Sequence, residues 1–236
     1  MTAGRLELKY CVPEPVAAHV LDVARAYLEP EPLARGPRQL VTSLYLDTPD
    51  LRFLRWHQEG ADDRYKLRIR GYGALPAATL YRELKRKTAS VVRKDRKAFP
   101  ADALRRVAEG CRARHGATPR TLVRGIRESL RDPGGETAVT ADRALQYQRT
   151  RRADLVGANG LWTPLPLPPC PGSSPVLVEL KFGEHPPAWM DVLIDALEPS
   201  RVSYSKYVAA MTGCAAGEAP GTPAVRYTDA RRFELV

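Results

Sequence analysis

The segment that decides the fold consists of three consecutive runs rich in basic residues. They read Arg64-Tyr65-Lys66-Leu67-Arg68-Ile69-Arg70, then Leu80-Tyr81-Arg82-Glu83-Leu84-Lys85-Arg86-Lys87, and then residues 91–99. Because successive strand residues point to opposite faces, the charged and apolar side chains of each run separate onto two faces. One face of the three runs carries Lys66, Arg68, Arg70, Glu83, Lys85, Lys87, Lys94 and Arg96. Cations on neighbouring strands repel one another, so we expect an anion among them.

A basic strand face that simply points into water is the alternative, and for any single strand it is the more common arrangement. The rest of the chain favours an inward face, because a Glu-Leu-Lys triplet occurs at residues 7–9, 83–85 and 179–181. A solvated face does not need such a repeated pattern. The same-face set extends to Arg5, Glu7, Lys9, Arg143, Arg149, Glu179 and Lys181.

Length and composition allow one large domain or two small ones, because the chain has 236 residues of which 44% are hydrophobic. Lys and Arg number 37 against 27 Asp and Glu, which gives a formal net charge of +10. That surplus points to a nucleic acid, an anionic membrane surface or a phosphate-rich small molecule. Nucleic-acid binding ranks low, because it needs basic residues interleaved with exposed aromatic side chains, and the aromatic residues here are few.

The cysteines indicate a reducing compartment. Cys11, Cys111, Cys170 and Cys214 are far apart in the sequence and form neither a metal-ligand spacing nor a disulfide framework. The first residues carry no secretory signal, and no apolar run approaches the length of a membrane span. The sequence therefore predicts a soluble cytoplasmic protein with free thiols.

The pattern along the chain predicts an α+β protein, an antiparallel barrel-like sheet with several covering helices. We expect one domain over residues 1–213 and a tail over 214–236 that could add an edge strand. The predicted strands are 4–12, 40–47, the three basic runs, 137–145, 147–155 and 176–182. The predicted helices follow Pro15, Leu51, Asp102, Thr118-Pro119, Pro186 and Ser203, and the fourth of them carries Val123, Ile126 and Leu130 on its apolar face.

A barrel lined by these faces is a basic tunnel with a few carboxylates. Buried lysines tend to lose their proton and isolated buried charges are costly, so the tunnel must hold water or an anion. The glutamates partly neutralise it and offer hard oxygen ligands for a divalent cation, which favours carboxylate and phosphate oxygens. Cations that clamp a phosphate chain beside a metal ion are the recurring apparatus of phosphoryl transfer.

An ordered series of short motifs resembles the VTC domain, the catalytic domain of the vacuolar transporter chaperone complex within the triphosphate tunnel metalloenzyme superfamily. The resemblance covers roughly residues 4 to 212. It implies an antiparallel tunnel barrel, a divalent metal (Mn²⁺ or Mg²⁺) and synthesis of polyphosphate from ATP. The motifs are Arg5–Tyr10, Ser43–Thr48, Lys66–Arg70, Glu83–Lys85, Val178–Phe182 and Ser205–Tyr207.

The resemblance also implies roles for individual residues. Those that would contact the triphosphate or the growing chain in catalysis are Lys9, Arg68, Arg70, Lys85, Arg143 and Lys206. Further phosphate-binding residues would be Lys66, Lys87, Lys94, Arg96, Lys181 and Arg149. Glu179 would be the main metal ligand, with Glu7 and Glu83 in support, although Glu179 could instead simply pair with a neighbouring arginine. The partners implied are ATP, polyphosphate or pyrophosphate, and a membrane-protein partner for translocation across a membrane.

The first position of the superfamily's ExExK signature departs from the pattern, since Arg5 stands where the first Glu belongs. The departure argues against a triphosphatase or adenylyl cyclase of the type that uses two carboxylates, and it is consistent with the VTC branch of the superfamily. Two alternatives stay open: a non-catalytic module that binds polyphosphate, inositol phosphate or nucleotide, and a triphosphatase of the same fold.

Overall fold

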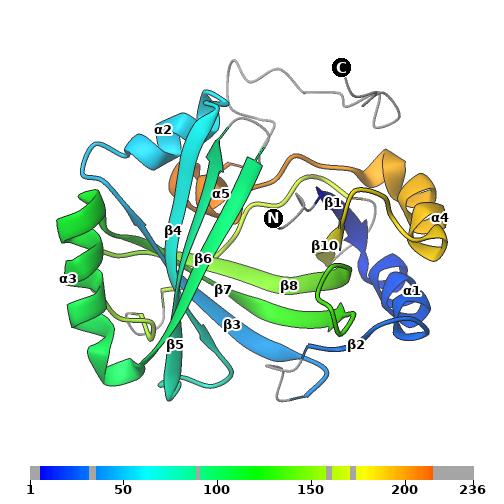
Figure 1. The fold of residues 1–236 in the computed structure, drawn as a ribbon, viewed down its shortest axis with the longest axis horizontal. Helices are drawn as coiled ribbons and strands as arrows, with labels where there is room; N and C mark the ends of the chain where they lie inside the picture. Colours follow the sequence, from blue (N-terminus) through cyan, green and yellow to red (C-terminus); the bar gives the residue numbers. More distant parts are fainter. Residues whose placement is uncertain (1–5, 32–35, 89–90, 158–160, 171–173, 215–236) are drawn as a thin grey trace.

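The computed structural model describes residues 6–31, 36–88, 91–157, 161–170 and 174–214, and its centre is a curved antiparallel sheet (Figure 1). The strands follow one another in the sheet in the order β1, β10, β8, β7, β3, β4, β5, β6. In that order their bounds are Leu6–Pro13, Pro175–Phe182, Ala138–Arg149, Thr118–Arg131, Gln39–Asp47, Asp63–Tyr72, Thr79–Thr88 and Val91–Pro100. Two short strands lie off this path: β2 (Glu29–Pro30) pairs with β7, and β9 (Thr163–Pro164) pairs with β8.

Helices cover one face of this sheet, which we call the outer face. Helices α1 (Glu14–Arg25) and α4 (Ala188–Leu197) pack on β1, β8 and β10, where Val178, Leu180 and Val139 are buried. Helix α3 (Leu104–His115) covers the outer face of the other half, over Leu67, Ile69 and Leu80. Two 3₁₀ turns, Ala101–Ala103 and Glu198–Ser200, flank these helices.

The opposite face, which we call the inner face, is apolar only at one end. There α5 (Lys206–Thr212) and α2 (Arg52–Gln58) pack on Tyr45, Leu177 and Val123. Beyond that end, charged side chains line much of the inner face, beside polar residues such as Ser43 and Thr140. Alternation along the strands therefore places the apolar core outward under the helices and leaves the basic face inward.

The predicted α+β class, an antiparallel sheet with several covering helices, is confirmed, but the sheet is not a closed barrel. β1 and β6 lie at the two ends of the strand path, and no strand pairing within the described residues joins them. The two ends nevertheless face each other, because Lys85 on β5 reaches Glu7 on β1 with 3.4 Å between Nζ and Oε2. Side chains, not backbone hydrogen bonds, bridge this gap.

The helix predicted from Thr118-Pro119 was wrong, since residues 118–131 form the 14-residue strand β7. Val123, Ile126 and Leu130 have the spacing of a helical stripe, but Val123 packs on the inner face and Leu130 on the outer face of the strand. The ladder between β7 and β8 contains a bulge whose extra residue lies on β8, between Arg143 and Gln146. Gly125 lies opposite this bulge, where an added Cβ would come within 3.0 Å of the Arg143 carbonyl oxygen. The two strands predicted over 137–155 are in fact one, β8.

Asp47 connects β3 to both helices at the apolar end. Its buried carboxylate accepts hydrogen bonds from the backbone N–H groups of Phe53 and Leu54 at 2.9 Å each, which satisfies the first turn of α2. The hydroxyl of Tyr207 on α5 donates its hydrogen bond to the same carboxylate at 2.5 Å. Within the motif Ser43–Thr48, Asp47 therefore has a structural role, because it holds α2 and α5 against β3.

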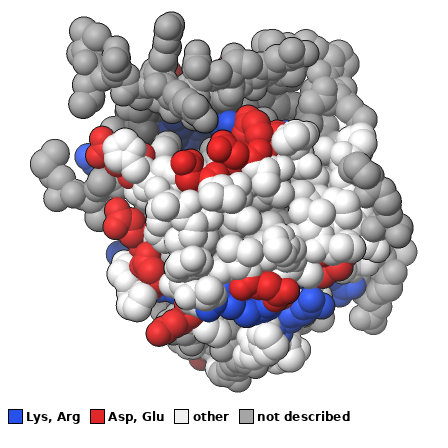
Figure 2. All heavy atoms as spheres, turned by 90° about the vertical axis from the view of Figure 1, so that its right-hand side faces the viewer, with Lys and Arg blue, Asp and Glu red and all other residues white. Residues whose placement is uncertain are grey.

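The expected tail and its edge strand lie outside the described residues, apart from Cys214. In the described part of the chain, no helix is both long enough and apolar enough to span a bilayer. The surface over α1 and α4 is mostly uncharged or acidic, with Lys and Arg gathered along one edge (Figure 2). The excess positive charge is therefore not spread evenly over the molecule.

Candidate active site

Charged side chains from seven strands and one helix meet on the inner face, and we call them the inner charge cluster. Alternation in β1, β4, β5, β6 and β10 brings them to one side, as the sequence indicated. The members are Glu7, Lys9, Lys66, Arg68, Arg70, Glu83, Lys85, Lys94, Arg96, Arg127, Asp142, Glu179, Lys181 and Lys206. The cluster has two carboxylate centres, which differ in their partners.

The first centre is Glu83 on β5, a carboxylate with only 3% of its side chain exposed. Its Oε2 lies 2.6 Å from Arg68 Nη2, 2.7 Å from Arg68 Nε and 3.9 Å from Arg70 Nη1. Its Oε1 lies 3.3 Å from Lys94 Nζ and 3.4 Å from Arg96 Nε. Burial acts to raise the pKa of Glu83, but Arg68, Arg70 and Lys94 hold it far below its usual range.

The second centre is the pair Glu7 and Glu179 on neighbouring strands. In the register of β1 and β10, Lys9 lies opposite Glu179 and Glu7 lies opposite Lys181, so opposite charges face each other across the ladder. Glu7 Oε1 is 3.0 Å from Lys9 Nζ, and Glu179 Oε2 is 2.7 Å from Lys181 Nζ.

The two carboxylates of this second centre repel each other. The Glu179 charge, followed by burial, acts to raise the pKa of Glu7, but Lys9, Lys181 and Lys85 lower it to about 2. The pKa of Glu179 also lies well below its usual value: burial opposes this, and Lys181, Lys206 and Lys9 outweigh burial. Both side chains are therefore ionised at neutral pH and offer anionic oxygens.

Arg127 and Asp142 belong to the cluster but were missed by the sequence analysis. Arg127 on β7 donates Nε and Nη2 to the two carboxylate oxygens of Asp142 on β8, at 2.8 and 2.7 Å. Lys206 Nζ lies 2.8 Å from Asp142 Oδ2 and 3.6 Å from Glu179 Oε1. Asp142 thus links α5 to the second centre. Arg127 was overlooked because its segment was expected to be helical.

Lys66 experiences the opposite electrostatic environment. Burial, followed by the charges of Lys9 and Lys85, holds the pKa of its ammonium group well below the usual value, while Glu7 acts weakly in the other direction. A lysine in such surroundings binds a proton more readily when an anion arrives. The inner charge cluster therefore favours a further anionic group near Lys66.

Three predicted site residues are not members of the inner charge cluster. Arg143 points to the outer face, where its Nε lies 2.8 Å from both carboxylate oxygens of Glu14 on α1 and its Nη1 lies 3.5 Å from Glu128. Arg149 donates to the carbonyl oxygen and, at 3.3 Å, to the sulfur of Met211 at the end of α5. Lys87 is on the inner face of β5, but nearer the end of the strand, opposite Arg64.

The carboxylates fit a divalent metal only in part. No group of three or more His, Cys, Asp or Glu side chains in the described residues forms a metal-binding set. Glu83 is held by its own four cations, so its expected role in supporting the metal does not fit this geometry. Glu7 and Glu179, whose negative charges repel each other, supply two hard oxygen donors, and phosphate oxygens can complete a coordination shell around such a pair.

Comparison with known proteins identifies relatives of the chain. A model of the VTC domain family matches residues 4–214. Among solved structures, a "putative adenylate cyclase" from Bacillus halodurans is similar, with a TM-score of 0.51 and 13% identity over 86% of this chain and 94% of that one. Another "putative adenylate cyclase", from Vibrio parahaemolyticus, has a TM-score of 0.50 and 15% identity over 89% of this chain and 99% of that one. No curated protein matches the sequence. At these identities the two structures share the fold.

Proposed function

Because this chain belongs to the VTC domain family, we propose that it is a metal-dependent phosphotransferase that lengthens polyphosphate with the γ-phosphate of ATP. The observation that carries the proposal is the convergence of lysines and arginines from β1, β4, β5, β6, β10 and α5 around three ionised glutamates, Glu7, Glu83 and Glu179. A phosphate chain is the ligand whose charge matches this arrangement.

The lysines near Glu7 and Glu179 are the best candidates to bind the reacting phosphates. Lys9, Lys206 and Lys66 lie on three different elements. The ammonium groups of Lys9 and Lys206 can move from carboxylate to phosphate, and that of Lys66 lies near the positive charges of Lys9 and Lys85, where an anion would be favoured. Lys85 and Lys181 can extend this set along the chain. Arg68 and Arg70 are already held by Glu83, so they present a fixed positive wall to the ligand.

The metal ion belongs with Glu7 and Glu179 in this proposal. Mn²⁺ or Mg²⁺ bound there supplies charge neutralisation for the transferred phosphoryl group. Asp142 acts indirectly, since it holds Lys206 and Arg127 beside Glu179.

The reaction needs no catalytic Ser, His or Cys. A terminal phosphate oxygen of the acceptor, polyphosphate or pyrophosphate, is already anionic and forms the new bond to the γ-phosphorus of ATP. The bond from that phosphorus to the β,γ-bridging oxygen breaks, and ADP leaves with the electron pair. Positioning and stabilisation of negative charge by the cations then supply the catalysis, as is general in phosphoryl transfer.

The test is formation of phosphate chains from ATP and Mn²⁺ by the purified protein, compared with the Arg68→Ala and Glu179→Ala variants and measured by gel electrophoresis of the chains. We expect both variants to lose at least about a hundredfold in rate, the usual effect of removing a group that stabilises transition-state charge. Arg143→Gln is the matched control, because Arg143 lies on the outer face against Glu14, and it should keep the parent rate. Chain synthesis by both alanine variants at the parent rate would reject the site.

The same assay separates the alternatives. Release of phosphate from tripolyphosphate without chain growth would identify a triphosphatase. Tight binding of polyphosphate in calorimetry, with neither turnover nor metal dependence, would identify a binding module. Either result would replace the proposed polymerase.

A further inference from the structure

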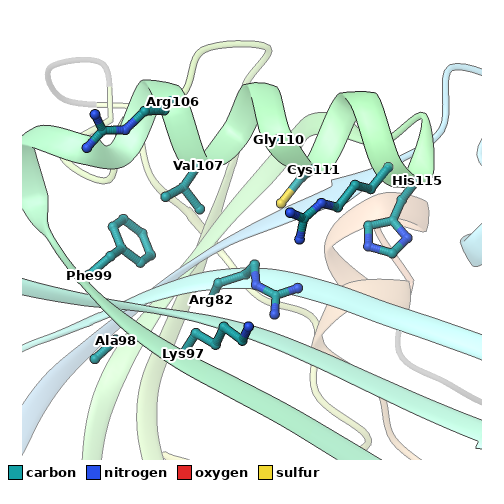
Figure 3. Close-up of a pocket in the computed structure, with 10 residues that line it drawn as sticks. Arg82, Lys97, Ala98, Phe99, Arg106, Val107, Gly110, Cys111 and His115 are labelled. Carbon is teal, nitrogen blue, oxygen red and sulfur yellow. The ribbon is translucent and has the colours of Figure 1, made fainter.

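A second basic site lies on the outer face of the sheet, beneath α3 and on the other side of β5 and β6 from the inner charge cluster. A cavity of about 300 Å³ opens there between the helix and the two strands (Figure 3). Its size is at the lower end of the range for small-molecule sites. None of the residues that line it belongs to the inner charge cluster.

The strands contribute two cations to this cavity. Arg82 on β5 lies directly opposite Lys97 on β6, an arrangement in which like charges repel each other. In Figure 3 these two side chains lie next to each other below the helix. Arg82 donates a hydrogen bond to Asp95, which in the described part of the chain is the one carboxylate that forms an ion pair with a cation of this cavity.

Helix α3 contributes a row of residues spaced by four, which places Arg106, Gly110 and Arg114 on one stripe of the helix. His115, at the end of the next stripe, senses the positive charge: after burial, Arg82 and Arg114 are the causes that lower its pKa. The cavity is therefore positive overall, with Arg82 and Lys97 below and two arginines above.

Gly110 lines the cavity and has no side chain to occupy it. A Cβ atom added there would meet no other atom within 4 Å, so the backbone packing does not require glycine. Glycine in a helix interior costs about 1 kcal/mol relative to alanine. The chain thus keeps a destabilising residue where a larger side chain would fill the space between Arg106 and Arg114.

The remaining wall is apolar. Phe99 on β6 and Val107 on α3 face each other at one end of the cavity, and Cys111 lies further along the helix (Figure 3). A simple inorganic anion would use the cations and leave this wall unused. A ligand with both an anionic and an apolar part fits the two halves of the lining.

We propose that this outer cavity binds a small organic phosphate, with its phosphate groups at Arg82, Lys97 and Arg114 and its apolar part against Phe99 and Val107. The site is separate from the inner charge cluster, and the inference does not rest on the proposed polymerase activity. A nucleoside diphosphate is the probe that has both chemical features.

The experiment is calorimetric titration of the full chain with ADP in the presence of EDTA. We expect Gly110→Leu, which fills the cavity, to bind one ADP fewer per chain than the parent. Gly110→Ala is the matched control, because it removes the helix-destabilising glycine, adds a single methyl group and should keep the parent stoichiometry. Equal stoichiometry in the parent and Gly110→Leu, or absence of ADP binding by the parent, would overturn the proposal.

Two further ligands test the chemical class, with the difference between parent and Gly110→Leu as the measure of this site. Adenosine lacks phosphate and tripolyphosphate lacks an apolar part, so each should bind there at least about tenfold more weakly than ADP. Arg114→Gln should also weaken ADP binding at this site about tenfold, since it removes a charge-assisted contact. Binding of either ligand as tight as that of ADP, or an unchanged affinity in Arg114→Gln, would reject an organic phosphate as the ligand.

Discussion

The two carboxylate centres of the inner face are both neutralised by cations, but the kind of cation differs. Glu83 pairs with Arg68 and Arg70 through its Oε2 atom and with Lys94 and Arg96 through its Oε1 atom. In the described part of the chain, Glu7 and Glu179 form ion pairs with lysines alone, and the two carboxylates repel each other. Guanidinium groups form rigid, planar contacts, whereas ammonium groups are mobile. The first centre is therefore suited to structure and the second to exchange of ligands.

The largest expected effect is on stability and comes from removing the charge of Glu83 in the first centre. Glu83→Gln leaves Arg68 and Arg70 without their buried counter-ion, so we expect the free energy of unfolding to fall by about 3 kcal/mol or more. Urea denaturation measures it. Glu31→Gln is the control, since it removes a more exposed partner of Arg131 and should change stability by less than about 1 kcal/mol. A Glu83→Gln protein as stable as its parent would contradict a structural role for this centre.

The next largest effect is on activity and comes from removing the charge of Glu179 in the second centre. Glu179→Gln should lower the unfolding free energy by less than Glu83→Gln does, because the loss of the lysine pairs is partly offset by relief of the repulsion with Glu7. Phosphate-chain synthesis should fall at least about a hundredfold. The two measurements distinguish the centres. If Glu179→Gln lost as much stability as Glu83→Gln but kept the parent rate of chain synthesis, the second centre would be structural and our assignment would be wrong.

The smallest effect concerns Lys66. Its folded-state pKa is depressed by burial and by Lys9 and Lys85, so the unfolded chain binds the proton more readily. Stability should accordingly rise with pH between the lowered folded value and the unfolded value near 10.5. Lys66→Met removes this slope and should stabilise the protein, in the absence of phosphate ligands, by on the order of 1 kcal/mol below that window.

Denaturation curves of the parent and Lys66→Met across the alkaline range test this prediction. The same variant should bind tripolyphosphate more weakly, since it lacks a cation that the ligand would recharge. Parallel stability curves for the two proteins would mean that Lys66 titrates normally. Unchanged tripolyphosphate affinity would place the ligand away from Lys66.

Strand alternation was enough to predict most of the inner charge cluster from sequence. Glu7, Lys9, Arg68, Lys85 and Glu179 meet because their strands keep a strict period of two, which the charged residues make visible. Lys206 did not follow from alternation; it came from the resemblance to the VTC domain, and its contacts with Asp142 and Glu179 bring it into the cluster.

The sequence pattern misled in β7 and β8. In β7, Val123, Ile126 and Leu130 have a helical spacing although Val123 lies on the inner face and Leu130 on the outer face, and the helix predicted from this spacing hid Arg127. In β8 the choice of Arg143 over Asp142 was an error of one residue, and such an error moves a side chain to the opposite face of the sheet. Closure of the barrel could not be inferred either, because pairing of the first and last strands depends on sheet curvature and leaves no local pattern.

The central claim is that the second centre binds metal and phosphate together. Crystals soaked with Mn²⁺ and tripolyphosphate test it directly, because manganese is located by its anomalous scattering. Our account predicts one manganese peak between Glu7 and Glu179, with phosphate density extending toward Lys9, Lys66 and Lys206. A manganese peak at Glu83, or tripolyphosphate bound only at the outer face, would contradict it.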